Sequence, residues 1–232
     1  MSGPIDQLDT TIPGVVVIVD EHAVRVWSGQ PLYVLSSALM GGGFGHTRDI
    51  VNMHVDDVAP DSSPQAELAA FAADLDLGDG FVGLMTAAAT QHARLTVARH
   101  DDLTVASVVS VGLSNTTRAG LTPPAAPALG TINAIVLVDG CLTDAAMVNA
   151  VITATEAKAA VLAEWDVRTP DGDPATGTST DAVVVACTRR GDPLPYAGPA
   201  TSVGHLVART VRDAIGHVCS DKVARDGGRI GW

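Results

Sequence analysis

The chain has 232 residues, of which 47% are hydrophobic, 17% charged and only 3% aromatic, and its formal net charge at pH 7 is −12. The apolar share argues against a disordered chain, while the acidic charge and the scarcity of rings argue against nucleic-acid binding. The N-terminus lacks a signal-peptide pattern and no apolar run approaches the roughly 20 residues of a membrane span, so we expect a cytoplasmic protein without a membrane partner.

The N-terminal part of the chain predicts strands. Residues 14–20 and 23–29 are rich in valine and are joined by two residues, which indicates a β-hairpin. A third strand over 31–40 leads into the glycines 41–43, and a fourth, within 46–55, alternates apolar with polar side chains. Because successive glycines leave the backbone bare, this glycine run is a candidate substrate-binding loop, although its spacing matches no phosphate-binding motif.

The middle of the chain alternates one helix with further strands. An amphipathic helix is predicted over 62–77 and an apolar strand over 81–88. Two more strands, over 93–99 and 103–113, are expected to pair, and another strand spans 130–140.

The strongest pattern in the chain is a helix that begins after Thr143. Apolar residues recur with a spacing of three and four up to Trp165, which is the period of an α-helix. Thr143 suits the N-cap position, and Asp144 suits the positive end of the helix dipole. A threonine-rich loop over 175–181 follows this helix, and the valines at 183–185 then predict a buried strand.

A last helix is predicted over 202–224, and the proline-rich segment 122–129 is expected to form a surface loop. Many strand connections are too short for parallel crossovers, so an antiparallel or mixed sheet is expected. The sequence therefore predicts a single α+β domain over residues 1–232, in which a layered sheet packs with a long central helix and a C-terminal helix.

Polar side chains are concentrated at strand ends and in loops, which makes them candidates for a functional site. Glu156 falls within the apolar pattern of the central helix, where a carboxylate could act as a general acid or base, or could cap a backbone group or pair with an arginine. Asp181 either orders its loop as an Asx turn or orients a base, activates water or binds a metal. The hydroxyls of Thr178, Ser179 and Thr180 either include a nucleophile or, as is more common, bond to the loop or to a ligand.

Cations and histidines complete the candidate set. Lys158 and Arg118 could stabilise an oxyanion or simply pair with acids at the surface. His46 and His54 are best suited to proton transfer, although a lone histidine is more often structural. The candidate catalytic residues are Glu156, Lys158, Asp181, Thr178, Thr180 and His54, and the candidate substrate-binding residues are Gly41, Gly42, Gly43, Asn52, Thr86, Asn115, Asn133, Thr153 and Ser179.

Two sequence blocks are specific: T-A-T-E-A-K-A-A at 153–160 and A-T-G-T-S-T-D-A-V-V-V-A at 175–186. Further blocks lie at 36–43, 52–55, 83–88, 111–115, 130–133 and 196–204. Together, and in this order, these blocks resemble the adenosylcobinamide amidohydrolases, the CbiZ family of cobinamide-salvage enzymes. The resemblance covers nearly all of the chain from about residue 30, whereas residues 1–30, with the N-terminal hairpin, match poorly.

The resemblance implies a hydrolase that cleaves the amide joining the aminopropanol arm to the corrin ring of adenosylcobinamide, giving adenosylcobyric acid for cobalamin salvage. Amide hydrolysis needs an activated water or nucleophile, an oxyanion donor and an acid for the departing amine. We assign the base to Glu156 or a histidine, oxyanion stabilisation to hydroxyls or N–H groups of residues 178–180, and assistance to Lys158 or Asp181. The cobalt enters as part of the corrinoid substrate, so no cofactor and no protein-bound metal are expected.

Other functions remain open. A non-catalytic corrinoid-binding or carrier protein would keep the glycine loops but would not need Glu156 beside the threonine-rich loop. A hydrolase or acyltransferase with an N-terminal threonine nucleophile would require chain cleavage before Thr178 or Thr180. A metal site of His54, Glu156 and Asp181 lacks a recognised ligand spacing, as do the three cysteines. An exposed apolar helix face would be compatible with a homo-oligomer.

Overall fold

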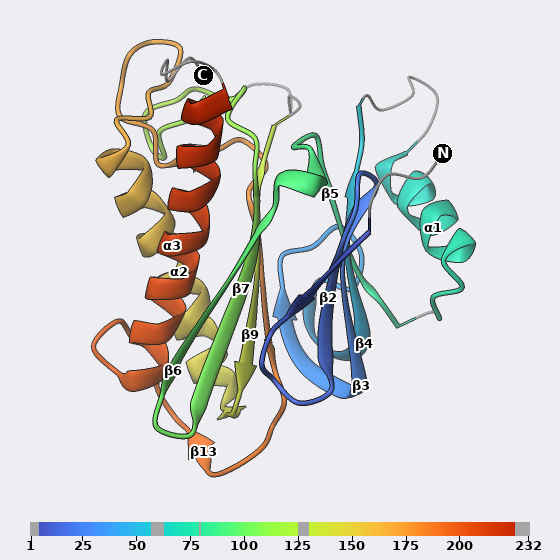
Figure 1. Ribbon diagram of the computed structural model, residues 1–232. Helices are drawn as coiled ribbons and strands as arrows, with labels where there is room; N and C mark the ends of the chain where they lie inside the picture. The colour runs from blue at the N-terminus through green and yellow to red at the C-terminus, as the bar shows by residue number, and fades with distance from the viewer. Residues whose placement is uncertain (1–4, 57–62, 79, 125–129, 226–232) are drawn as a thin grey trace.

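The structure is built on one mixed sheet that folds over on itself. The computed structural model describes residues 5–56, 63–78, 80–124 and 130–225. The molecule has four layers, which Figure 1 shows from left to right: the helices α2 and α3, the half of the sheet with β6, β7 and β9, the half with β2, β3 and β4, and the helix α1. The larger elements are β1 (Asp6–Asp9), β2 (Val15–Val19), β3 (Ala23–Ser36), β4 (Gly43–His54), α1 (Pro64–Asp74), β5 (Val82–Thr86), β6 (Arg94–His100), β7 (Leu103–Val111), β9 (Ile132–Asp139), α2 (Asp144–Glu164), β12 (Ala182–Cys187) and α3 (Ser202–Arg225). The shorter elements are η1 (Thr90–His92), β8 (Thr116–Thr117), β10 (Cys141–Leu142), β11 (Gly177–Thr178) and β13 (Pro193–Leu194).

The strand order of the large sheet is β1-β2-β3-β12-β9-β7-β6, and β4 pairs with β3 and with β5. β12 runs parallel to β9 and β4 runs parallel to β5, while the other pairs in this sheet are antiparallel. The predicted α+β class with a mixed sheet, a long central helix and a C-terminal helix is therefore confirmed. So are the hairpin of β2 with β3 and the pairing of β6 with β7.

The prediction of two separate strands over 23–29 and 31–40 is wrong, because β3 runs continuously from Ala23 to Ser36. Its pairing with β4 shifts register between Trp27 and Leu32. Pro31 lies in this interval and lacks a backbone N–H, so the ladder is interrupted there while the strand continues as an irregularity. The first half of β3 can thus pair with β2 and the second half with β12.

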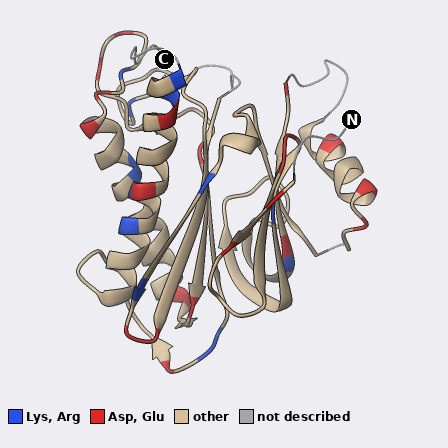
Figure 2. Ribbon diagram, viewed as in Figure 1, with Lys and Arg blue, Asp and Glu red and all other residues tan. Residues whose placement is uncertain are grey.

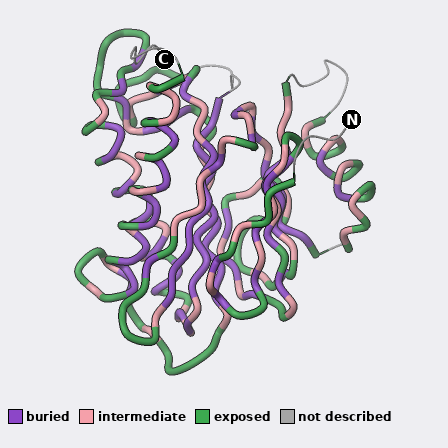
Figure 3. Tube along the Cα trace, in the orientation of Figure 1, coloured by how far each residue is buried: buried purple, intermediate pink, exposed green. Residues whose placement is uncertain are grey.

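Apolar residues fill the space between the layers. One core cluster lies between the two halves of the sheet and joins residues such as Val26 and Ile50 to Ile135 and Val184. The second core cluster lies under α2 and α3, and Figure 3 shows the buried inner sides of these helices and the buried strands beneath them. A small third cluster, which includes Leu68, holds α1 against β4 and β5.

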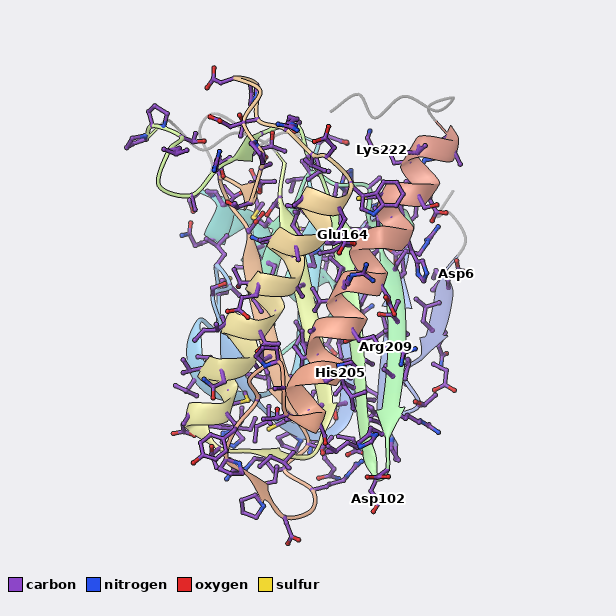
Figure 4. The ribbon with its side chains drawn as sticks, turned by 90° about the vertical axis from the view of Figure 1, so that its left-hand side faces the viewer. Asp6, Asp102, Glu164, His205, Arg209 and Lys222 are labelled. Carbon is purple, nitrogen blue, oxygen red and sulfur yellow. The ribbon has the colours of Figure 1, made fainter. Side chains whose placement is uncertain are left out.

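The central helix begins as predicted, because the Thr143 side chain accepts a hydrogen bond from the Ala146 N–H. By length and hydropathy α2 could cross a membrane, but one side of it is part of the core under the two helices. It packs beside α3 (Figure 4), and the exposed Arg212–Glu164 ion pair joins the two. α3 carries charges of both signs on its outer surface (Figure 2). The predicted loop 122–129 lies outside the described residues from 125 onward.

Candidate functional site

Asp181 stands immediately before β12, and its carboxylate accepts four hydrogen bonds. Oδ1 accepts the Thr178 hydroxyl at 2.5 Å and the Ile132 N–H at 3.0 Å. Oδ2 accepts the Thr178 N–H at 3.1 Å and the ammonium group of Lys158. A carboxylate has about four lone-pair sites, so this one is fully engaged and held in one orientation. It joins the threonine-rich loop to β9 and to α2.

The Lys158–Asp181 ion pair is largely withdrawn from solvent, since each side chain is 13% exposed. Lys158 comes from α2, 23 residues earlier in the chain. Gly177 makes room for the pair, because a Cβ at that position would lie 2.6 Å from the Lys158 Nζ. At low exposure a charge pair interacts more strongly than at the surface, so the ammonium group and the carboxylate form a preorganised electrostatic unit.

A two-stranded ribbon positions Thr178. Strand β11 pairs antiparallel with β8, with Thr178 opposite Thr116, a pairing that the sequence analysis did not predict. The Thr176 N–H donates to the Thr117 carbonyl at 2.9 Å, and the Asn115 side chain donates to the Ser179 hydroxyl at 2.7 Å. Two polar loops far apart in sequence, 114–120 and 175–181, therefore meet at the candidate site.

The loop hydroxyls have different partners. Thr178 donates to the Asp181 carboxylate, whereas Thr180 donates to the Gly130 carbonyl at 2.8 Å. Thr131 in turn donates to the Thr180 carbonyl at 2.8 Å. Among the hydroxyls of the loop 176–180, Thr178 is thus the one in direct contact with a carboxylate that could take its proton.

A buried polar network lies behind the loop. Asn133 donates to the Asn52 side chain and to the Met85 carbonyl, both at 2.8 Å, and Asn52 donates to Ser110 at 2.9 Å. Asn52 and Asn133 are 1% and 2% exposed, and Thr86 is 2% exposed. These predicted substrate-binding residues lie in the interior, where Asn52 and Asn133 satisfy each other's buried polar groups and the Thr86 hydroxyl accepts from the Ala88 N–H at 3.0 Å.

Two predicted residues of α2 are placed differently from expectation. The prediction that Glu156 lies in an apolar environment is wrong, because it is exposed and two residues from Lys158, a spacing at which side chains point away from each other. Thr153 is 1% exposed and donates to the Ala197 carbonyl at 2.8 Å, so it ties α2 to the segment before α3. This burial argues against the expected substrate contact of Thr153.

The remaining predicted groups lie at the edges of the site. His54 contacts the Ala88 carbonyl at 3.1 Å and Asp56 at 3.2 Å, and no contact links it to Glu156 or Asp181 in the described part of the chain. These three residues therefore do not form the metal site considered above. The described residues contain no group of three or more histidine, cysteine, aspartate or glutamate side chains arranged to hold a metal ion.

The glycine run has a packing role at its first position. Gly41 has a φ of +68°, and a Cβ there would lie 2.7 Å from the Phe81 carbonyl oxygen, so the loop can approach β5 only with glycine. Gly43 has a φ of +87° and nothing within 4 Å of where its Cβ would lie. Ser37, just before this loop, accepts a hydrogen bond from the Val183 N–H at 3.0 Å, two residues after Asp181.

Sequence reasoning missed the Ile132 N–H and Gly177 as parts of the site. A backbone N–H leaves no signal in a side-chain pattern. Gly177, however, is flanked by Thr176 and Thr178, and a glycine in that position indicates close approach of other groups.

Comparison with known proteins is consistent along most of the chain. A family model for adenosylcobinamide amidohydrolase matches residues 9–226. The chain is 38% identical over 174 residues to an adenosylcobinamide amidohydrolase of Halobacterium salinarum, covering 69% of this chain and 68% of that protein. It is 30% identical over 181 residues to the protein of the same name from Methanosarcina mazei, covering 74% and 82%. Among solved structures, the PH0078 protein of Pyrococcus horikoshii shares the fold, with a TM-score of 0.51, 12% identity, and coverage of 95% of this chain and 89% of that one.

Proposed function

This chain belongs to the adenosylcobinamide amidohydrolase family, and on that premise we propose that it hydrolyses the amide joining the aminopropanol arm to the corrin ring of adenosylcobinamide. The products are adenosylcobyric acid and aminopropanol. The reaction takes place in the cytoplasm, and adenosylcobyric acid re-enters cobalamin synthesis. The cobalt is part of the substrate, and the protein needs no cofactor of its own.

The observation that carries this proposal is the meeting of a hydroxyl, a carboxylate and an ammonium group in one largely buried place, where Thr178 is 8% exposed and the Lys158 and Asp181 side chains are 13% exposed each. Thr178 donates to Asp181 at 2.5 Å, and the same carboxylate holds Lys158. These are the chemical types of a nucleophile, a general base and an oxyanion stabiliser. A carrier protein without turnover would not need them together.

We assign the steps to these three side chains. The Thr178 oxygen attacks the amide carbonyl carbon while its proton passes to the Asp181 Oδ1, and the carbonyl electron pair moves onto the oxygen. The Lys158 ammonium stabilises that oxyanion. The Lys158 ammonium turns from the Asp181 carboxylate toward this oxyanion as the negative charge moves there. The oxyanion pair then re-forms the carbonyl, the carbon–nitrogen bond breaks, and its electron pair leaves on the amine nitrogen, which takes the proton from Asp181, so that the acyl group remains as an ester on Thr178.

Water completes the reaction. A water molecule attacks the ester carbon on Thr178 and gives a proton to Asp181. The ester carbon–oxygen bond then breaks, the Thr178 oxygen takes that proton back from Asp181, and the carboxylic acid is released from the free enzyme. Glu156 or His54 as the base, the expectation from sequence, is the competing assignment. The exposure of Glu156 and the contacts of His54 with Ala88 and Asp56 favour Asp181 instead.

Mass spectrometry of the products tests the function. The purified, EDTA-treated protein should release aminopropanol and adenosylcobyric acid from adenosylcobinamide. Tight corrinoid binding with no product, with or without added divalent ions, would leave only the carrier function, while activity that requires a divalent ion would refute the metal-free assignment.

Variants separate the candidate bases and nucleophiles. Thr178→Val keeps the shape of the side chain but removes the hydroxyl, so we expect binding without hydrolysis, whereas Thr178→Ser should retain activity. Glu156→Gln should leave the rate within about twofold of wild type. A Thr178→Val enzyme with more than a tenth of the wild-type rate, or an inactive Glu156→Gln enzyme that still binds, would overturn the assignment. The intact mass of the active protein excludes or reveals chain cleavage before Thr178.

A further inference from the structure

A strip of the sheet beside α2 is not covered by either helix of that layer. It consists of Tyr33 and Leu35 on β3 and Phe44 and His46 on β4, and we call it the aromatic strip. Tyr33 is opposite His46 and Leu35 is opposite Phe44, so all four side chains emerge on one face. Tyr33 and Leu35 pack against the core under α2, whereas Phe44 is 48% exposed. The blue strands β3 and β4 emerge at the edge of α2 in Figure 4.

Tyr33 is fixed from several sides. Its hydroxyl donates to the Asp144 carboxylate at 2.7 Å, and the guanidinium carbon of Arg189 lies 4.9 Å from the centre of its ring. The His46 ring centre lies 5.0 Å away. The Phe44 ring is stacked near it, with 5.9 Å between centroids and 20° between planes. Phe44 is therefore the outer member of a rigid stack.

The backbone around Phe44 is bare. It is flanked by Gly43 and Gly45, and a Cβ on Gly43 would meet nothing within 4 Å, while one on Gly45 would reach only a Val34 methyl group at 4.0 Å. Here no neighbouring side chain in the sequence shields the Phe44 ring, so a flat ligand can reach it.

The aromatic strip is continuous with the candidate site. Leu35 is paired with Val185, which lies four residues beyond Asp181, so about 13 Å of extended strand at about 3.3 Å per residue separates them. Ser37 bonds to Val183 between these two points. A ligand larger than an ordinary metabolite could contact both places at once.

We propose that Phe44 stacks on the adenine ring of the adenosyl group of the substrate, with the aromatic strip as its platform. This inference rests on the proposed function, which supplies a substrate with a purine. The adenine is the fully aromatic flat surface of adenosylcobinamide, whereas the edge of the corrin is saturated and carries amide arms. Stacking of a base on an aromatic side chain is the recognition that an exposed phenyl ring between glycines provides.

Equilibrium binding with two ligands tests this proposal. Adenosylcobinamide and cyanocobinamide share the corrin but differ in the adenosyl group, and binding is measured by the quenching of tryptophan fluorescence in the Thr178→Val background. Replacing an aromatic side chain that stacks on one base by alanine weakens binding by roughly 5- to 150-fold. We expect Phe44→Ala to weaken adenosylcobinamide binding by this factor and to leave cyanocobinamide binding unchanged. Phe44→Tyr should bind both ligands like the parent.

Trp27→Ala is the matched control, because Trp27 is 47% exposed on the same strand, before the register shift, and should affect neither ligand. Equal losses for both ligands in Phe44→Ala would assign the strip to the corrin and overturn the adenine proposal, as would no loss for either. Unfolding midpoints exclude a folding defect. A protein that discriminates the two ligands through Phe44 but releases no product would refute the proposed function and leave this inference standing.

Discussion

Replacement of Asp181 by asparagine tests the claim that one carboxylate joins the threonine-rich loop, α2 and β9. The change removes the negative charge and one of two acceptor oxygens, and it leaves the Lys158 ammonium at 13% exposure without its counter-ion. Removing one partner of a buried ion pair costs about 3–5 kcal/mol, and a surface pair contributes only about 0–1 kcal/mol. Because this pair is not fully enclosed, we expect a loss of about 3 kcal/mol in the free energy of unfolding.

Urea unfolding followed by circular dichroism measures this loss, and a fall in Tm of roughly 6–12 °C should accompany it at about 2–4 °C per kcal/mol. Asp173→Asn is the control, because Asp173 pairs with Arg118 at 3.3 Å with side chains 50% and 38% exposed. It should cost less than about 1 kcal/mol. A double variant, Lys158→Met with Asp181→Asn, should be less destabilised than the sum of the single changes. If Asp181→Asn were no more costly than Asp173→Asn, the reasoning from burial would be refuted.

Two further predictions concern buried thiols and helix glycines. Burial raises the pKa of Cys219 to about 11 and also raises the pKa of Cys187. In the folded protein at pH 8, Ellman's reagent should therefore modify at most Cys141, and it should modify all three thiols only in urea. Fast modification of all three thiols in the folded protein would contradict this. Since the unfolded thiols release their protons near a pKa of about 8.5, stability should be full below that pH and should decline as the pH rises toward 11. Gly204→Ala should prevent stable folding, because the added Cβ would overlap the backbone before α3. Gly216→Ala, also within α3, should instead raise the free energy of unfolding by about 0.5–1 kcal/mol, as measured by urea unfolding. Equal effects of the two substitutions would show that the backbone near Gly204 can move to accept the Cβ.

Elements with a strong local signal were predictable from the sequence. The helix after Thr143 was predictable because a capping side chain and an apolar period coincide there. The strand β12 was predictable because both of its faces are buried, which requires a run of valines. The ribbon of β8 with β11 was not predictable, since each strand has only two residues and the pairing joins segments about 60 residues apart. The continuity of β3 through Pro31 was equally hidden, because only the pairing of its two halves with β2 and β12 shows it.

The candidate site shows the same division at the level of side chains. Lys158 could be singled out as a rare cation and Asp181 as the acid at the head of a strand, but their contact depends on where α2 lies across the sheet. Glu156 was misplaced for a specific reason. The helix carries alanines on its exposed side as well, at Ala160 and Ala163, so apolar residues occur all round it and the period does not define a buried face.

The glycine run illustrates why a motif has to be divided residue by residue. From sequence, the three glycines formed one candidate loop because a bare backbone suits a ligand. Gly41 is required by its contact with the Phe81 carbonyl and by its positive φ, which are matters of packing. Gly43 and Gly45 have open space around them and flank the exposed Phe44. The ligand-binding argument therefore applies to the second part of the segment, where the bare backbone gives access to an aromatic ring, and the first part fixes the position from which that ring is presented.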